Sequence, residues 1–196
     1  MKFNHALFLD RDGTLIKECN GLLHETQIEF EEGIKEFLSH AINKKFKIIM
    51  ISNQTVVSKG LLTYDQMLFL NNKIIKKIDE LCNKKVFDDV YICPFHPDAQ
   101  VKKYKRDSNY RKPKPGMLMK AKQKFNISFH RSLMIGDRIS DVISGNLVGC
   151  NTVLKLNEYS SARLIKSDLE YLPKMKKPDY KVNSLKDIIP IMDTLT

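Results

Sequence analysis

The chain alternates short apolar runs with longer segments in which apolar residues recur at helical spacing. The continuous runs predict buried strands, which fall at residues 6–9, 47–51, 89–92, 132–135, 151–155 and 180–182. The periodic segments predict helices over residues 34–43, 64–83, 116–125 and 141–148. Helices alternating with short apolar strands are typical of the α/β class, so we expect a Rossmann-like, doubly wound parallel sheet covered on both faces.

Two long stretches, residues 93–115 and 157–179, have no apolar pattern. Unpatterned loops of this length are usually functional or disordered. The second is rich in serine and lysine, and we expect its lysines on the solvated surface: Lys174, Lys176 and Lys177. No strong domain boundary appears in the 196 residues, so we expect a single domain spanning 1–196.

The composition is that of a soluble globular protein, with 42% hydrophobic and 29% charged residues, and it disfavours disordered, collagen-like and coiled-coil chains. No apolar run approaches the ~20 residues of a membrane span, and the N-terminus lacks signal-peptide features, so we expect a cytoplasmic protein without a membrane partner. The cysteines, at positions 19, 82, 93 and 150, have no paired spacing and are expected to be reduced. The net charge of +10 favours a polyanionic or phosphorylated partner only weakly.

Two aspartates stand at the end of the first predicted strand. Asp10 and Asp12 follow the apolar run 6–9 and precede a glycine. Residues two positions apart in an extended segment point the same way, and ligands of open parallel sheets bind beyond the carboxyl ends of the strands. Two carboxylates placed together need a cation or a proton, and a hard divalent cation with oxygen ligands suits them.

Other candidate groups follow other predicted strands or precede a helix. Asp137 ends the fourth strand after a glycine, and Asp141 lies four residues further on, where it could cap the next helix. Ser52 and Asn53 follow the second strand, where small polar groups can hold an anion. Lys112 lies in a cationic run just before the third helix, where a lysine can neutralise developing negative charge.

Taken in chain order, Asp-x-Asp-Gly-Thr, Ser-Asn, Lys and Gly-Asp-x-x-x-Asp resemble the motifs of the haloacid dehalogenase superfamily. The Asp-Arg-Asp-Gly-Thr block, the Asn-Gln loop and the Arg-Lys-Pro-x-Pro-Gly-Met run resemble the heptose-bisphosphate and histidinol-phosphate phosphatases in particular. The resemblance covers nearly the whole chain. It implies the haloacid dehalogenase fold without a large cap domain, and a magnesium-dependent phosphoric monoester hydrolase.

The resemblance also implies a role for each chemical group. Asp10 is expected to be the nucleophile that forms an aspartyl-phosphate, and Asp12 the general acid and then the general base. Ser52 and Lys112 are expected to bind the oxygens of the transferring phosphoryl group. Mg²⁺ is expected to be held by Asp10, Asp137 and the backbone carbonyl of Asp12.

The substrate implied first is a heptose bisphosphate, with removal of the 7-phosphate of D-glycero-D-manno-heptose 1,7-bisphosphate. The resemblance implies substrate contacts for Asn20, Gly21, Asn53, Arg111 and Arg138. Histidinol-phosphate phosphatase is the alternative, followed by a polynucleotide 3′-phosphatase and by a phosphate-binding module without catalysis. Few aromatic residues interleave with the basic ones, so we expect no nucleic-acid partner, and we expect a monomer.

One departure from the family concerns a structural zinc loop. The relatives' pattern is Cys-x-His followed by Cys-x-Cys just before Arg-Lys-Pro, and the corresponding positions here are Cys93, Phe95, Ser108 and Tyr110. Cys93 is retained, and His96 lies one residue late. Two ligands do not make the closed tetrahedral site of structural zinc, so we expect no zinc, with Phe95 and Tyr110 packed together in its place.

Further departures concern the loops around the predicted site. Val56 stands where the asparagine loop of the relatives has a glycine, so this turn must adopt a conformation that valine tolerates. Asp141 is expected to orient Lys112 or waters bound to the metal. The basic excess concentrates in residues 102–114, which predicts a positive rim over a phosphate site.

Overall fold

The computed structural model describes residues 3–157 and 177–195 of the chain. Nearly all of the unpatterned stretch 157–179, including Lys174 and Lys176, lies outside these residues. Within the two described ranges, no helix combines the length and the apolar character needed to cross a membrane.

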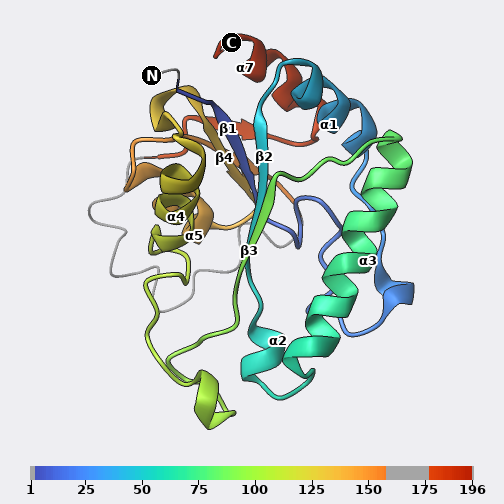
Figure 1. Ribbon diagram of the computed structural model, residues 1–196, viewed down its shortest axis with the longest axis vertical. Coiled ribbons are helices and arrows are strands. Elements are labelled where there is room, and N and C mark those ends of the chain that lie inside the picture. Colours follow the sequence, from blue (N-terminus) through green and yellow to red (C-terminus); the bar gives the residue numbers. More distant parts are fainter. Residues whose placement is uncertain (1–2, 158–176, 196) are drawn as a thin grey trace.

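Six parallel strands in the described part of the chain form one sheet. They are β1 (Ala6–Leu9), β2 (Lys47–Asn53), β3 (Asp89–Cys93), β4 (Leu133–Gly136), β5 (Asn151–Lys155) and β6 (Tyr180–Val182). Their order across the sheet is β3-β2-β1-β4-β5-β6, and every neighbouring pair is parallel (Figure 1). The predicted α/β class with a parallel sheet is confirmed, and β2 continues past its predicted end at residue 51 to Asn53.

Helices cover both faces of this sheet, as a doubly wound fold requires. One face carries α1 (Ile34–Asn43), α3 (Tyr64–Cys82) and α7 (Ile189–Asp193). The other face carries α4 (Gly116–Phe125) and α5 (Ile139–Asn146), which lie next to each other in Figure 1. The short α2 (Thr55–Ser58) directly follows the end of β2.

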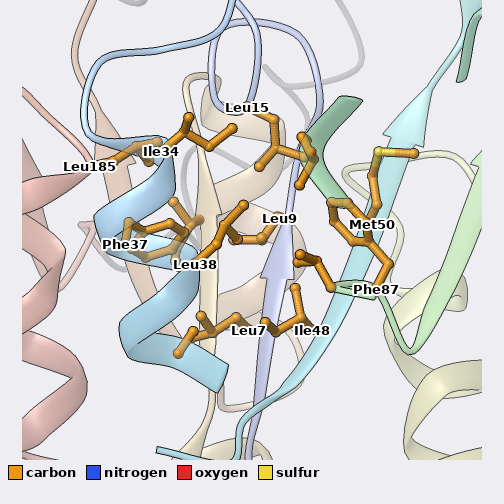
Figure 2. Packing of buried hydrophobic residues seen from close by; sticks show 14 of the residues in the cluster. Leu7, Leu9, Leu15, Ile34, Phe37, Leu38, Ile48, Met50, Phe87 and Leu185 are labelled. Carbon is orange, nitrogen blue, oxygen red and sulfur yellow. The ribbon is translucent and has the colours of Figure 1, made fainter. Parts of the chain in front are cut away.

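Side chains that alternate across each strand build a separate core on each face. Leu7 and Leu9 of β1 meet Phe37 and Leu38 of α1, as Figure 2 shows. Phe8, between them, points to the opposite face and joins the core beneath α4. All five of these side chains are fully buried. Because both faces are covered, the strands read as continuous apolar runs, which is why the sequence predicted them.

The ends of α3 and α5 differ from the prediction. Helix α3 ends at Cys82 because Asn83 adopts a left-handed conformation with φ of 51°. Helix α5 begins at Ile139, two residues before its predicted start at Asp141. Asp141 is therefore not the N-cap but lies in the first turn, where its Oδ2 accepts a hydrogen bond from the backbone N–H of Arg138 at 3.0 Å.

Candidate active site

The ends of β1, β2 and β4 meet where the strand order reverses. Strands β2 and β3 lie on one side of β1, and β4, β5 and β6 lie on the other. Open α/β sheets bind their ligands at such a switch point, outside the carboxyl ends of the strands. Asp10 directly follows β1, Ser52 lies near the end of β2, and Asp137 directly follows β4. The fold therefore brings these predicted residues to one edge of the sheet.

Three carboxylates form an acidic cluster at this edge. One oxygen each of Asp10, Asp137 and Asp141 lies within 4.8 Å of the others, and all three residues are buried. Burial raises the pKa of Asp10 to about 6, an effect that Lys112 opposes and Asp141 reinforces. Burial and the charges of Asp10 and Asp141 raise the pKa of Asp137 to about 7. The acidic cluster thus holds more negative charge than its own surroundings stabilise.

Lys112 supplies positive charge to this acidic cluster. Its Nζ lies 2.7 Å from Oδ1 of Asp10, 2.7 Å from Oδ1 of Asp141 and 3.0 Å from the carbonyl oxygen of Ile51. Burial alone would lower the pKa of Lys112, but the two carboxylates raise it above its ordinary value. The amide of Asn53 donates to the backbone carbonyl of Lys112 at 2.9 Å and accepts its N–H at 3.1 Å. Asn53, predicted to bind substrate, thus also fixes the backbone of the lysine, and the predicted contact between Asp141 and Lys112 is present.

The side chain of Asp12 is held by Arg11 and Gln54, neither of which was predicted to be a catalytic or substrate-binding residue. Arg11 donates to Oδ1 of Asp12 from Nε at 3.0 Å and from Nη2 at 2.8 Å, and to Oδ2 from Nη2 at 2.9 Å. Gln54 donates from Nε2 to Oδ2 of Asp12 at 3.1 Å and to Oγ of Ser52 at 2.7 Å. Gln54 therefore links two predicted catalytic residues that come from different strand ends.

The acidic cluster fits a divalent cation. Oδ1 of Asp137 is buried and has no hydrogen-bond partner among the residues described, whereas Oδ2 accepts a hydrogen bond from Asn157 at 3.0 Å. A buried carboxylate oxygen without a donor is costly, and a cation would satisfy it. The all-oxygen donor set suits Mg²⁺. Of the three predicted ligands, Asp10 and Asp137 belong to the acidic cluster, and its third carboxylate is that of Asp141. The side chain of Asp12, which is predicted to bind through its backbone carbonyl, is not part of the cluster.

A cavity of about 220 Å³ opens above these strand ends. Its wall includes all five residues predicted to contact substrate: Asn20, Gly21, Asn53, Arg111 and Arg138. The predicted catalytic residues Asp10, Asp12 and Lys112 also line it, whereas Ser52 and Asp137 are each 1% exposed and lie outside the lining residues.

Basic side chains give one part of this cavity a positive character. Nη2 of Arg138 donates a hydrogen bond to Glu18 at 2.7 Å. Burial alone would lower the pKa of Arg138, but the negative charges of nearby carboxylates raise it, and that of Asp10 has the largest effect among them. Nη1 of Arg111 donates to the carbonyl oxygen of Phe95 at 3.3 Å, and Lys59 lines the cavity as well. Within the predicted positive rim at residues 102–114, the lining residues are Arg111 and Lys112, so the rim is narrower than expected.

The loop where relatives hold zinc is packed by aromatic and basic side chains. The ring of Phe95 lies 6.1 Å from the ring of Tyr104 and 3.5 Å from the guanidinium carbon of Arg106. Tyr110, the partner predicted for Phe95, is 43% exposed, so the predicted pair is replaced by Phe95 and Tyr104. Among residues 3–157 and 177–195, the acidic cluster is the one group of three or more potential metal-ligating side chains. The expected absence of zinc, with Cys93 buried at the end of β3, stays a prediction.

Comparisons with known proteins agree with this geometry. A HAD-hydrolase-like family model matches residues 109–188. The D-glycero-beta-D-manno-heptose-1,7-bisphosphate 7-phosphatase of Photorhabdus laumondii is 32% identical over 183 residues, covering 88% of this chain and 95% of its own. The D-glycero-alpha-D-manno-heptose-1,7-bisphosphate 7-phosphatase of Burkholderia mallei is 31% identical over 168 residues, covering 82% of this chain and 84% of its own.

Solved structures agree on the fold. A HAD-like phosphatase from Mesorhizobium loti has a TM-score of 0.79 at 23% identity, covering 98% of this chain and 88% of its own. The D,D-heptose 1.7-bisphosphate phosphatase of B. bronchiseptica, solved with magnesium and phosphate, has a TM-score of 0.78 at 15% identity, covering 99% of this chain and all of its own. With the sequence relatives at 31% and 32% identity over most of both chains, the protein belongs to the heptose-1,7-bisphosphate 7-phosphatase family of the HAD superfamily of phosphatases.

Proposed function

We propose that this protein removes the 7-phosphate of a D-glycero-D-manno-heptose 1,7-bisphosphate through an aspartyl-phosphate on Asp10. The observation that carries the proposal is the position of Asp10 on the cavity wall, with its Oδ1 2.7 Å from a buried lysine and beside two further carboxylates. A carboxylate that must attack phosphorus needs its charge balanced without being protonated. Lys112 contributes positive charge at the point where the negative phosphoryl group would arrive.

Asp12 can carry out both proton transfers of the reaction. An oxygen of Asp10 bonds to phosphorus while the bond from phosphorus to the sugar oxygen breaks, and Asp12 gives its proton to that oxygen. In the second half, Asp12 takes a proton from water, whose oxygen attacks the phosphorus and releases inorganic phosphate from Asp10. Lys112 and Ser52 bind the phosphoryl oxygens throughout.

A divalent cation completes this arrangement. Asp10, Asp137 and the backbone carbonyl of Asp12 would hold Mg²⁺, which would neutralise negative charge on the phosphoryl group. Asp141 holds Lys112 by a contact of 2.7 Å, so the lysine stays beside Asp10. This ion pair keeps the positive charge in place when substrate enters or product leaves.

The choice of substrate rests on the relatives and on the charge of the cavity. The relatives from Photorhabdus and Burkholderia are named for heptose 1,7-bisphosphate, and that substrate carries a second phosphate. Lys59, Arg111 and Arg138 line the cavity and suit a second anionic group. The amino group of histidinol phosphate would bring a positive charge to the same surroundings, so these residues disfavour that alternative.

Phosphate release in the presence of Mg²⁺ tests this proposal. The substrates compared are both anomers of the heptose bisphosphate, histidinol phosphate and a 3′-phosphorylated oligonucleotide. We expect the highest kcat/KM on a heptose bisphosphate; a higher value on either other substrate would overturn the substrate assignment. Asp10→Asn should abolish turnover, whereas the same substitution at the exposed Asp107 should not; activity retained in Asp10→Asn would overturn the nucleophile.

A further inference from the structure

Arg11 is a buried cation placed directly beside the proposed acid and base. Its side chain is 1% exposed, although arginine is rarely buried without partners. Three of its hydrogen bonds go to Asp12, and Nη1 donates to Oδ1 of Asn71 at 2.7 Å. The guanidinium thus connects the turn after β1 to a residue in the middle of α3.

Asn71 is an unusual residue for its position. It lies on the buried face of α3, among Met67, Leu70 and Ile74, and is 2% exposed. A buried amide is costly unless it is hydrogen-bonded, and asparagine is also a weak helix former. Its Oδ1 accepts from Arg11, and its Nδ2 donates to the sulfur of Met67 at 2.8 Å. The bond to the guanidinium is the strong one, because its donor is charged.

Arg11 and Asn71 together hold the carboxylate of Asp12 in place, and we call this pair of side chains the clamp. Both oxygens of Asp12 accept from Arg11, and Oδ2 also accepts from Gln54, so the ionised carboxylate lies against the planar guanidinium in one orientation. When Asp12 carries the proton that it donates, one of these hydrogen bonds must open while the others keep the carboxyl group in place. The guanidinium in turn is anchored by Asn71 on a helix of 19 residues that begins with a capping box. A general acid must meet the leaving oxygen within hydrogen-bond reach, and a misplacement of about 1 Å can cost about 100-fold in rate.

We propose that Asn71, acting through Arg11, is a positioning residue for Asp12. This inference rests on the proposed role of Asp12 as the general acid. A sugar alkoxide is a poor leaving group and needs the proton of Asp12, whereas p-nitrophenolate leaves without one. A clamp that positions the acid therefore matters for alkyl phosphates and not for p-nitrophenyl phosphate, while a loss of general stability would affect both.

The experiment measures kcat/KM, which reports formation of the aspartyl-phosphate, on heptose bisphosphate and on p-nitrophenyl phosphate. Asn71→Leu removes the acceptor for Arg11 and keeps a side chain that branches at Cγ. We expect it to lower kcat/KM about 10- to 100-fold on the alkyl phosphate and less than about threefold on the aryl phosphate. Asn71→Asp restores an acceptor and should recover most of the loss.

Two matched controls lie on the same helix. Asn72→Leu makes the same substitution at the exposed neighbouring position, and Met67→Leu removes the sulfur acceptor while leaving the bond between Arg11 and Asn71. Both should keep the wild-type ratio of the two kcat/KM values. Thermal unfolding of each variant shows that it is folded at the assay temperature.

Asp12→Asn separates a failure of this inference from a failure of the proposed function. If Asp12→Asn lowers the alkyl and aryl values equally, Asp12 is not the general acid and the proposed function is wrong on that point. If Asp12→Asn shows the selective loss and Asn71→Leu does not, the clamp is overturned and the role of Asp12 stands. An equal loss on both substrates in Asn71→Leu also overturns the clamp, because it reports damage to the fold.

Discussion

Replacing Lys112 by methionine should destabilise the protein in the absence of metal and abolish turnover. Methionine keeps an unbranched side chain but removes the ammonium group, which leaves Asp10 and Asp141 without their cation. The side chains of Lys112, Asp10 and Asp141 are 2%, 8% and 1% exposed, so solvent compensates only a small part of the lost charge. Removing one partner of a buried ion pair costs about 3–5 kcal/mol. This is a large share of the ~5–15 kcal/mol by which proteins are stable.

The cost of Lys112→Met should depend on pH in a defined direction. The pKa values of Asp10 and Asp137 are already raised to about 6 and about 7 from an ordinary 3.8, and losing the lysine removes an opposing charge from Asp10. A carboxyl with a raised pKa binds more protons in the folded than in the unfolded state, so stability falls as pH rises from the unfolded to the folded value. The free-energy difference between wild type and Lys112→Met should therefore be smaller at pH 5, where Asp10 binds a proton, than at pH 7.5.

Urea unfolding in EDTA, followed by circular dichroism at pH 5 and pH 7.5, measures this difference. Lys114→Met is the matched control, because Lys114 contacts Asp107 in a partly exposed pair worth about 0–1 kcal/mol. The double variant Lys112→Met/Asp141→Asn removes one unpaired charge and should regain stability without regaining turnover. A cost for Lys112→Met below about 1 kcal/mol at pH 7.5, or an equal cost at both pH values, would refute the reasoning.

Three further predictions concern metals. Asn157→Ala removes the donor 3.0 Å from Oδ2 of Asp137 and should weaken Mg²⁺ binding about tenfold in calorimetry, whereas unchanged affinity would contradict that orienting role. Mg²⁺ should raise Tm more at pH 7.5 than at pH 5.5. The pKa values of Asp10 and Asp137 are raised to about 6 and about 7, so protons compete with Mg²⁺ for these ligands at the lower pH. Equal increases in Tm at both pH values would contradict this competition. Purified protein should contain far less than one equivalent of zinc by mass spectrometry, since Cys93 is the one retained ligand of the relatives' pattern, and a full equivalent would show the expectation wrong.

Elements with strong local signals could be predicted to the residue, and those set by distant contacts could not. The bounds of α1 and α4 match the prediction, because apolar periodicity begins and ends clearly there. Helix α5 starts earlier than predicted because Asp141 accepts the N–H of Arg138 from inside the first turn instead of capping the helix. Helix α2 has four residues, too few to show any period, and it went unpredicted.

The candidate site likewise contains residues that could be predicted from the sequence and residues that could not. Asp10 and Asp137 could be predicted because each follows an apolar strand and the ends of parallel strands share one edge. Arg11 was missed because an arginine is usually exposed, and its burial depends on α3 lying over the turn. Asn71 did leave a signal: it is a polar residue on the face of α3 that is otherwise apolar, and a buried amide requires a partner.

Val56 shows how two loops shape one wall of the cavity together. It stands where the resembling family has a glycine, and the structure places it in α2, 6% exposed and on the cavity wall. Glycine is required at position 21, because Gly21 has a φ of 110° and an added Cβ would lie 3.1 Å from Cγ1 of Val56. A side chain at position 21 would therefore be strained by its backbone conformation and would also press against Val56. The contact between these two loops thus shapes the cavity wall, whereas Asp10 and Asp137 directly follow strands that the sheet itself holds in place.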